Sequence, residues 1–186
     1  GGLDHSLHLE RREGQRRFRQ LLEEEIEKVT LFFLRKQGDL AERLSSLGEE
    51  RRRLGAGGDG NQEEPARPPA RPAAALGSVL TEIDRLKAEY RSQGEQVCHL
   101  VHFIYLNVTA VRKILKKHDK NFAELSLLRS FWAVEVTRTD FSHLPQMYHY
   151  EGIAAIVASI KKALSELKGA EYEVQVLLGN PELSQS

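Results

Sequence analysis

The chain has 186 residues and a mass of 21.1 kDa, which is the size of one domain. Its 27 basic and 27 acidic residues give a net charge of zero, which excludes a protein that binds polyanions over its whole surface. Hydrophobic residues make up 40%, charged residues 29% and aromatic residues only 7% of the chain, which favours long amphipathic helices over an all-β fold.

The first predicted element is one long helix from Glu10 to Leu54. Its apolar residues recur mostly at every third or fourth position among charged ones, and no proline interrupts it. We expect one apolar stripe to be buried. The stripe consists of Phe18, Leu22, Ile26, Val29, Phe33, Leu40, Leu44 and Leu47.

Residues 55–77 change abruptly to Gly, Pro, Ala and Arg, which cannot bury apolar surface and so predict a flexible linker. Its prolines also allow an interpretation as a PxxP ligand.

A second long helix is predicted from Ser78, as N-cap, to about Lys120. Two such helices can bury their apolar stripes against each other as an antiparallel pair. The second stripe consists of Leu86, Tyr90, Val97, Leu100, Ile104, Val111, Ile114 and Leu115.

Shorter helices and turns are predicted from Phe122 to Phe141, and a last helix opens at Pro145 and ends at Lys168-Gly169. The tail, residues 170–186, receives no assignment. The expected architecture is an all-α, elongated helical bundle over residues 1–186, a single domain with two long antiparallel helices and shorter C-terminal ones. The opening Gly1-Gly2, without Met, indicates an excised fragment.

Positive charge is concentrated in residues 107–120 (NVTAVRKILKKHDK), where Arg112 and four lysines face a single acid, Asp119. At about 100° per residue, the four lysines share one arc of the helix, opposite its apolar side. His118 lies on the apolar side, so we expect its ring to pack in the core. A solvated surface is one interpretation and an anion site is the other. The near absence of interleaved acids favours the anion site, and flexible lysines suit a ligand with many phosphates. These lysines are Lys113, Lys116, Lys117 and Lys120.

A second basic group, near the start of the first helix, is formed by Arg11, Arg12, Arg16, Arg17 and Arg19. The helix dipole disfavours cations in a first turn. The group therefore has two interpretations: it extends the anion surface, or the helix begins later than Glu10. Lys28 is a weaker candidate for the same surface.

The stretch LNVTAVRKILKKHDK (106–120) resembles the signature helix of SPX domains, and residues 21–44 resemble their long third helix. The end section, residues 143–167, is most similar to SPX domains that precede the major-facilitator portion of vacuolar phosphate transporters. The resemblance implies a regulatory sensor that binds inositol polyphosphates or pyrophosphates and signals phosphate status to an attached phosphate transporter or a partner protein. Carried over to this chain, the ligand-binding residues are Lys113, Lys116, Lys117 and Lys120, and Asp119 orients neighbouring lysines.

SPX domains begin with a helical hairpin that this sequence does not contain. We therefore expect an incomplete pocket, weaker ligand binding and an exposed apolar strip that allows self-association into an oligomer. The expected location is cytosolic, on the cytosolic face of the vacuolar membrane where a transporter portion is attached. The chain itself has no apolar stretch of the roughly 18 residues that a membrane span needs, and no signal peptide.

An alternative function is a helical protein-protein interaction module without a small-molecule ligand. Specific nucleic-acid binding is not expected, because the basic stripe lacks interleaved aromatic residues. An enzyme is not expected either, since no nucleophile, P-loop or metalloprotease motif occurs. No cofactor or metal is predicted: Cys98 is the single cysteine, which also favours a reducing compartment, and no carboxylate completes a site with His99 and His102.

Overall fold

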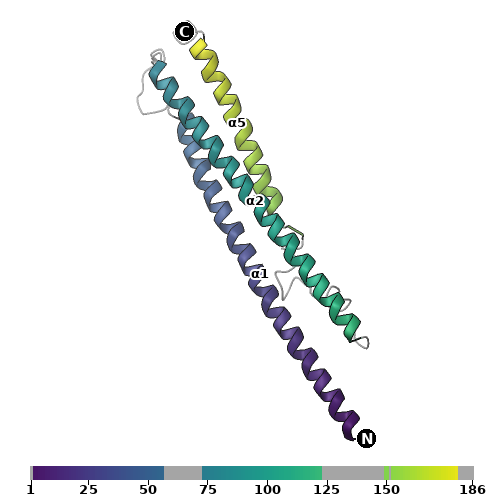
Figure 1. The fold of residues 1–186 in the computed structure, drawn as a ribbon. Coiled ribbons are helices and arrows are strands. Elements are labelled where there is room, and N and C mark those ends of the chain that lie inside the picture. The colour runs from purple at the N-terminus through teal and green to yellow at the C-terminus, as the bar shows by residue number, and fades with distance from the viewer. Residues whose placement is uncertain (1, 57–72, 123–148, 151, 180–186) are drawn as a thin grey trace. The chain divides into compact units, whose positions relative to one another are not determined.

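The structure is a computed structural model that describes residues 2–56, 73–122, 149–150 and 152–179 (Figure 1). These residues form three helices: α1 (Gly2–Ala56), α2 (Ala73–Asn121) and α5 (Ile153–Gly179). The prediction of an all-α helical bundle is confirmed. Of the predicted linker at 55–77, residues 57–72 lie outside the described residues, whereas its two ends, 55–56 and 73–77, are helical, so the prediction was wrong there. Residues 123–148, with Pro145, also lie outside the described residues, and the last helix begins at Ile153 instead of at Pro145.

The chain divides into two compact units. Unit 1 comprises residues 1–37 and 99–151, and unit 2 comprises residues 38–98 and 152–186. Each long helix contributes to both units, because the divisions fall inside α1 and α2.

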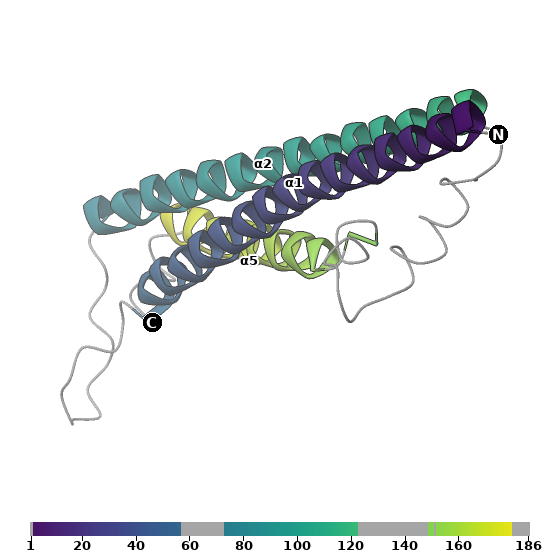
Figure 2. The ribbon, with the colours of Figure 1, turned by 90° about the horizontal axis from the view of Figure 1, so that it is seen from below.

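In unit 1 the first part of α1 runs antiparallel to the last part of α2 (Figure 2). Two ring contacts fix the register: Phe18 meets His118 with centroids 4.4 Å apart, and Phe32 meets Phe103 at 4.7 Å. The partner numbers change in opposite directions, as antiparallel packing requires. The buried apolar residues are Leu22, Ile26, Phe33, Leu100, Ile104 and Leu115.

Unit 2 packs three helical segments: the end of α1, the beginning of α2 and the whole of α5 (Figures 1 and 2). Ion pairs join each pair of segments. Arg43 of α1 binds Glu89 of α2 at 2.9 Å, and Lys87 of α2 binds Glu171 of α5 at 2.7 Å. Arg51 of α1 binds Glu166 of α5 at 2.5 Å. The largest fully buried side chains of this unit are Leu47, Ile83, Leu86, Tyr90 and Leu167.

The helix boundaries differ from those predicted. α1 begins at Gly2 instead of Glu10, and α2 begins at Ala73 instead of Ser78, so that Ser78 is inside the helix and is not its N-cap. The alanines at 73–75 are strong helix formers, which explains the earlier start of α2. The far end of α2, at Asn121, lies one residue beyond the predicted Lys120.

The last helix also ends later than predicted, at Gly179 instead of Lys168-Gly169. Gly169 is not among the described residues with a positive φ, so it does not form the left-handed cap that the prediction assumed. Beyond it Glu171 accepts a hydrogen bond from Lys87, which attaches the final turns to α2. At the other end, Gly152 has a φ of 80°, a conformation that favours glycine, immediately before α5 begins at Ile153.

The predicted stripe of α1 is confirmed: Phe18 and Val29 are half-buried and its other members are buried. The stripe of α2 is confirmed except at Ile114, whose side chain is 44% exposed although Leu115 beside it is 1% exposed. Ile114 was wrongly assigned, because a step of about 100° turns it away from the side that packs on α1. Cys98, also on α2, is a free and exposed thiol.

Candidate functional site

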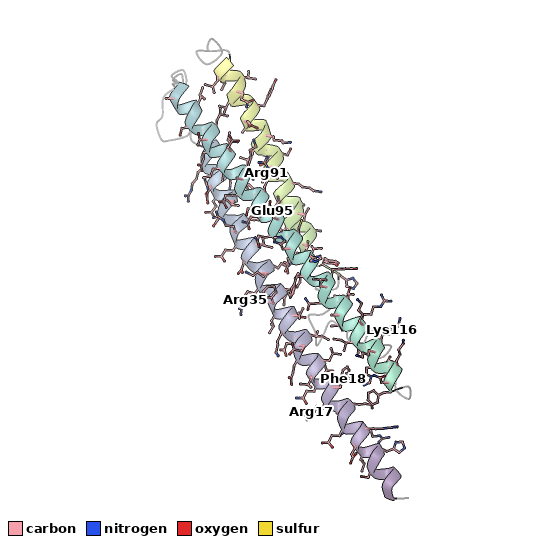
Figure 3. All side chains as sticks on the ribbon, viewed as in Figure 1. Arg17, Phe18, Arg35, Arg91, Glu95 and Lys116 are labelled. Carbon is pink, nitrogen blue, oxygen red and sulfur yellow. The ribbon has the colours of Figure 1, made fainter. Side chains whose placement is uncertain are left out.

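The four predicted ligand lysines lie together in the last turns of α2, in unit 1. Lys113, Lys116, Lys117 and Lys120 are all exposed, and we call them the lysine face. Figure 3 shows Lys116 on the side of α2 that is turned away from α1. The structure therefore places these ammonium groups on one exposed face of a helix.

The opposite side of the same turns is anchored in the core of unit 1. Leu115 is 1% and His118 is 6% exposed, and both alternate with lysines along the sequence. Because these two residues are held against α1, the lysines between and beside them must point outward. The local sequence thus sets the direction of the lysine face.

The lysine face carries no ion pair to a carboxylate of the described residues. Lysines elsewhere do: Lys28 pairs with Glu25 at 2.6 Å and Lys87 with Glu171 at 2.7 Å. The only acid within residues 107–120 is Asp119, which is half-buried and places its Oδ1 3.5 Å from Nδ1 of His118. Four cations are thus concentrated without neutralisation by the described parts of the chain.

His118 lies between two aromatic rings. The centroid of Phe18 is 4.4 Å from the imidazole with planes 21° apart, and that of Phe122 is 4.8 Å away with planes 27° apart. The backbone N–H of Phe122 also donates to the carbonyl of His118 at 3.0 Å. Packing of His118 is confirmed. Sequence reasoning missed its two ring partners, although the spacing of four residues between His118 and Phe122 was a local signal.

The basic group of α1 is part of the helix interior. Because α1 begins at Gly2, the interpretation that the helix starts after these arginines is wrong. Arg19 donates to Glu23 at 2.6 Å. For Lys28, the hydrogen bond with Glu25 raises the pKa of the ammonium, so this lysine is already engaged. The remaining exposed arginines are Arg11, Arg12, Arg16 and Arg17.

His99 and His102 are exposed on α2. Within the described ranges, no three or more side chains of the His, Cys, Asp or Glu type gather as metal ligands would. Among these same residues, no helix is long and apolar enough to cross a membrane.

The chain is similar to proteins named as SPX domain-containing membrane proteins. One from Oryza sativa subsp. japonica is 34% identical over 151 residues, which are 81% of this chain and 18% of the relative. Two from Arabidopsis thaliana are 33% and 30% identical over 177 and 175 residues, in each case 94% of this chain and 22% of the relative.

The chain thus spans about a fifth of the length of these relatives. No family model matches it, and no solved structure is significantly similar to it. Because the two Arabidopsis matches extend over 94% of this chain, they include the lysine face in the last turns of α2. The chain belongs to the family of SPX domain proteins.

Proposed function

We propose that this chain is a regulatory domain whose lysine face binds inositol polyphosphates or inositol pyrophosphates. The observation that carries the proposal is the exposure of four ammonium groups on one helix face with no ion pair to a described carboxylate. Each phosphate of such a ligand accepts several charge-assisted hydrogen bonds, which are about twice as strong as neutral ones.

The arrangement of the cations suits this ligand class. Lys113 and Lys117, like Lys116 and Lys120, are four residues apart, a spacing at which like charges weaken a helix by about 0.2–0.5 kcal/mol per pair. A compact polyanion would remove that repulsion on binding. Long flexible stems that end in point charges adapt to several phosphate positions around a ring.

The regulatory part of the proposal concerns what the domain is attached to. The similar proteins are named membrane proteins and are more than four times as long as this chain. We propose that occupancy of the lysine face signals phosphate status to an attached phosphate transporter or a partner protein. A sensor of this kind needs no catalytic group of its own.

Calorimetry with inositol hexakisphosphate tests the site. The triple variant Lys116→Ala, Lys117→Ala, Lys120→Ala should lose binding, with its helical circular dichroism unchanged. The matched control removes three exposed lysines of α5, in Lys161→Ala, Lys162→Ala, Lys168→Ala, and should bind as the wild type does. Equal losses in both variants would show that net charge, and not the lysine face, attracts the ligand.

Salt provides the second test. Because the proposed contacts are charge-assisted and exposed, the affinity should fall steeply between about 0.01 and 0.15 M salt, over which the screening length shortens from about 30 Å to about 8 Å. An affinity that ignores salt would contradict a site built from these lysines.

A protein-protein interaction module is the second candidate, because unit 1 exposes large apolar side chains. Leu21 is 53%, Phe32 is 43% and Ile114 is 44% exposed. A partner bound through these residues should be insensitive to both salt and inositol phosphates. The two functions are compatible if a ligand on the lysine face also contacts the partner.

A further inference from the structure

The exposed arginines near the start of α1 point in different directions. Arg11, Arg12, Arg16 and Arg17 are all exposed. At about 100° per residue, Arg12 and Arg16 lie only about 40° apart around the helix. Arg11 and Arg17 lie about 100° away from them, one on each side. Figure 3 shows Arg17 on the side of α1 that is turned away from α2. The basic group therefore divides into two pairs by direction.

Arg12 and Arg16 share one flank of the helix pair in unit 1 with a lysine of α2. The opposite flank is marked by Phe32 and Phe103, whose ring centroids are 4.7 Å apart. On α1, both arginines lie about 160° around the helix from Phe32. On α2, Lys116 lies about 140° around the helix from Phe103. The two arginines and Lys116 are thus on the flank away from the two rings.

The register of the two helices brings these cations to the same end of unit 1. Phe18 stacks on His118 with centroids 4.4 Å apart, and the helices are antiparallel. Arg16, two residues before Phe18, is therefore level with Lys120, two residues after His118. Arg12 lies about 6 Å further along the axis, at 1.5 Å per residue. Because the axes of packed helices are about 8–10 Å apart, long side chains from both helices can reach one ligand.

The two arginines are also without a neutralising partner. Among the residues that the structure describes, neither Arg12 nor Arg16 forms an ion pair, although Glu13 is exposed beside them. Arg19, further along the same side, is already bound to Glu23 at 2.6 Å. Like charges four residues apart weaken a helix, and a bound polyanion would remove the repulsion between Arg12 and Arg16.

We propose that Arg12 and Arg16 bind phosphate groups of the same ligand as Lys116 and Lys120, so that the site spans both helices of unit 1. This inference rests on the proposed function and adds two ligand residues from α1. A guanidinium donates two parallel hydrogen bonds to one phosphate, whereas an ammonium acts as a point charge. A ring with phosphates on all sides, as in inositol hexakisphosphate, can contact both helices at once, and a single orthophosphate cannot.

Calorimetry with inositol hexakisphosphate and the 186-residue chain tests the inference. The variant Arg12→Ala, Arg16→Ala should bind on the order of tenfold more weakly, because charge-assisted hydrogen bonds are lost. The matched control, Arg11→Ala, Arg17→Ala, removes the same charge from the same turns of α1 and should bind within about twofold of the wild type. Helical circular dichroism should be unchanged in both variants.

The difference between the two variants should also depend on salt. Contacts between exposed charges are screened, so the difference should shrink from about 0.01 to about 0.15 M salt. A loss of affinity that is the same at both salt concentrations would show that the arginines act through the structure of α1, and it would overturn the inference.

The outcomes separate this inference from the proposed function. Wild-type affinity in the Arg12→Ala, Arg16→Ala variant, or equal losses in both arginine variants, would overturn the inference. The proposed function would then still stand if the variant Lys116→Ala, Lys117→Ala, Lys120→Ala loses binding. If the wild-type chain does not bind the ligand, the proposed function and the inference are both wrong.

Discussion

The two units of this chain differ in how their charges are used. In unit 2, ion pairs connect all three helical segments, including Arg43 with Glu89 and Lys87 with Glu171. In unit 1, the lysine face has no such partner among the described residues, and large apolar side chains such as Leu21 are exposed. Ion pairs thus join the helical segments of unit 2, whereas unit 1 carries the lysine face that we propose as the ligand site.

This difference shows that one pair of long helices can be joined by ion pairs in one part of its length and expose unneutralised lysines in another. α1 and α2 form ion pairs with each other and with α5 in unit 2, whereas in unit 1 the lysine face at the end of α2 has no ion pair to a carboxylate of the described residues. Isolated surface ion pairs contribute little to stability, with a median of about 0–1 kcal/mol. The network therefore matters chiefly where several pairs share residues, as Glu50 does by contacting both Arg43 and Arg85.

The largest change in the free energy of unfolding is expected from substitutions in the hydrophobic cores. Such substitutions test whether each unit is stabilised by its own core. Phe33 is fully buried in unit 1, so Phe33→Ala should lower the free energy of unfolding by about 3–5 kcal/mol. Hydrogen exchange should show lost protection mainly in unit 1. Leu47→Ala is the reciprocal variant in unit 2. If either substitution lowers hydrogen-exchange protection equally in both units, the two units do not unfold separately.

The next effect concerns the ion pair that joins α2 to α5. The side chain of Lys87 is 9% exposed, and Glu171→Gln removes its closest negative charge, 2.7 Å away. We expect a loss of about 1–3 kcal/mol in urea unfolding, because a partly buried ammonium remains poorly paired. Lys162→Met, which breaks an exposed contact of 3.9 Å on α5, should change the free energy of unfolding by far less.

Alkaline pH should affect unit 2 through two groups. The hydrogen bond with Glu171 raises the pKa of Lys87, and burial raises the pKa of the Tyr90 hydroxyl. A group whose pKa is raised by folding contributes stability that is present below its unfolded pKa and is lost as the pH rises through the folded value. Stability should therefore decline above about pH 10, by an amount on the order of 1 kcal/mol.

Tyr90→Phe separates the two contributions, since it should make the decline of the unfolding free energy above about pH 10 less steep. Tyr172→Phe is the matched control, because the side chain of Tyr172 is 68% exposed. Identical pH profiles for the wild type and Tyr90→Phe would show that burial of this hydroxyl does not influence alkaline unfolding.

The smallest effect on the free energy of unfolding is expected at the lysine face, where we propose that the ligand binds. Replacing Lys116, Lys117 and Lys120 by Gln should leave the free energy of unfolding within about 0.5 kcal/mol of the wild type, with a slight gain at low salt, because repulsion between them is removed. Urea unfolding at two salt concentrations measures this. A clear loss of stability would mean that these lysines support the fold.

Periodicity predicted most of the core correctly because it reports which side of a helix is apolar. The stripe of α1 and the outward direction of Lys116 and its neighbours follow from a repeat of 3.6 residues alone. Ile114 was misassigned for a related reason: an apolar residue at the edge of the stripe is buried only if a neighbouring element covers that edge, which periodicity does not state.

The features that the sequence did not predict depend on residues far apart along the chain. The end of α5 was placed at Gly169, yet Glu171 beyond it binds Lys87, 84 residues away. The ring of Phe18 that stacks on His118 comes from the other helix. Local signals such as a basic turn followed by glycine carry no information about such partners.

The single thiol of the chain provides a practical consequence. Cys98 is free, exposed and the last residue of unit 2 within α2, immediately before unit 1 resumes at His99. A maleimide dye would therefore attach at one known position without any mutation. Fluorescence of a dye at Cys98 could report, in real time, whether ligand binding to the lysine face of unit 1 changes the surroundings of the residue at which unit 2 ends within α2.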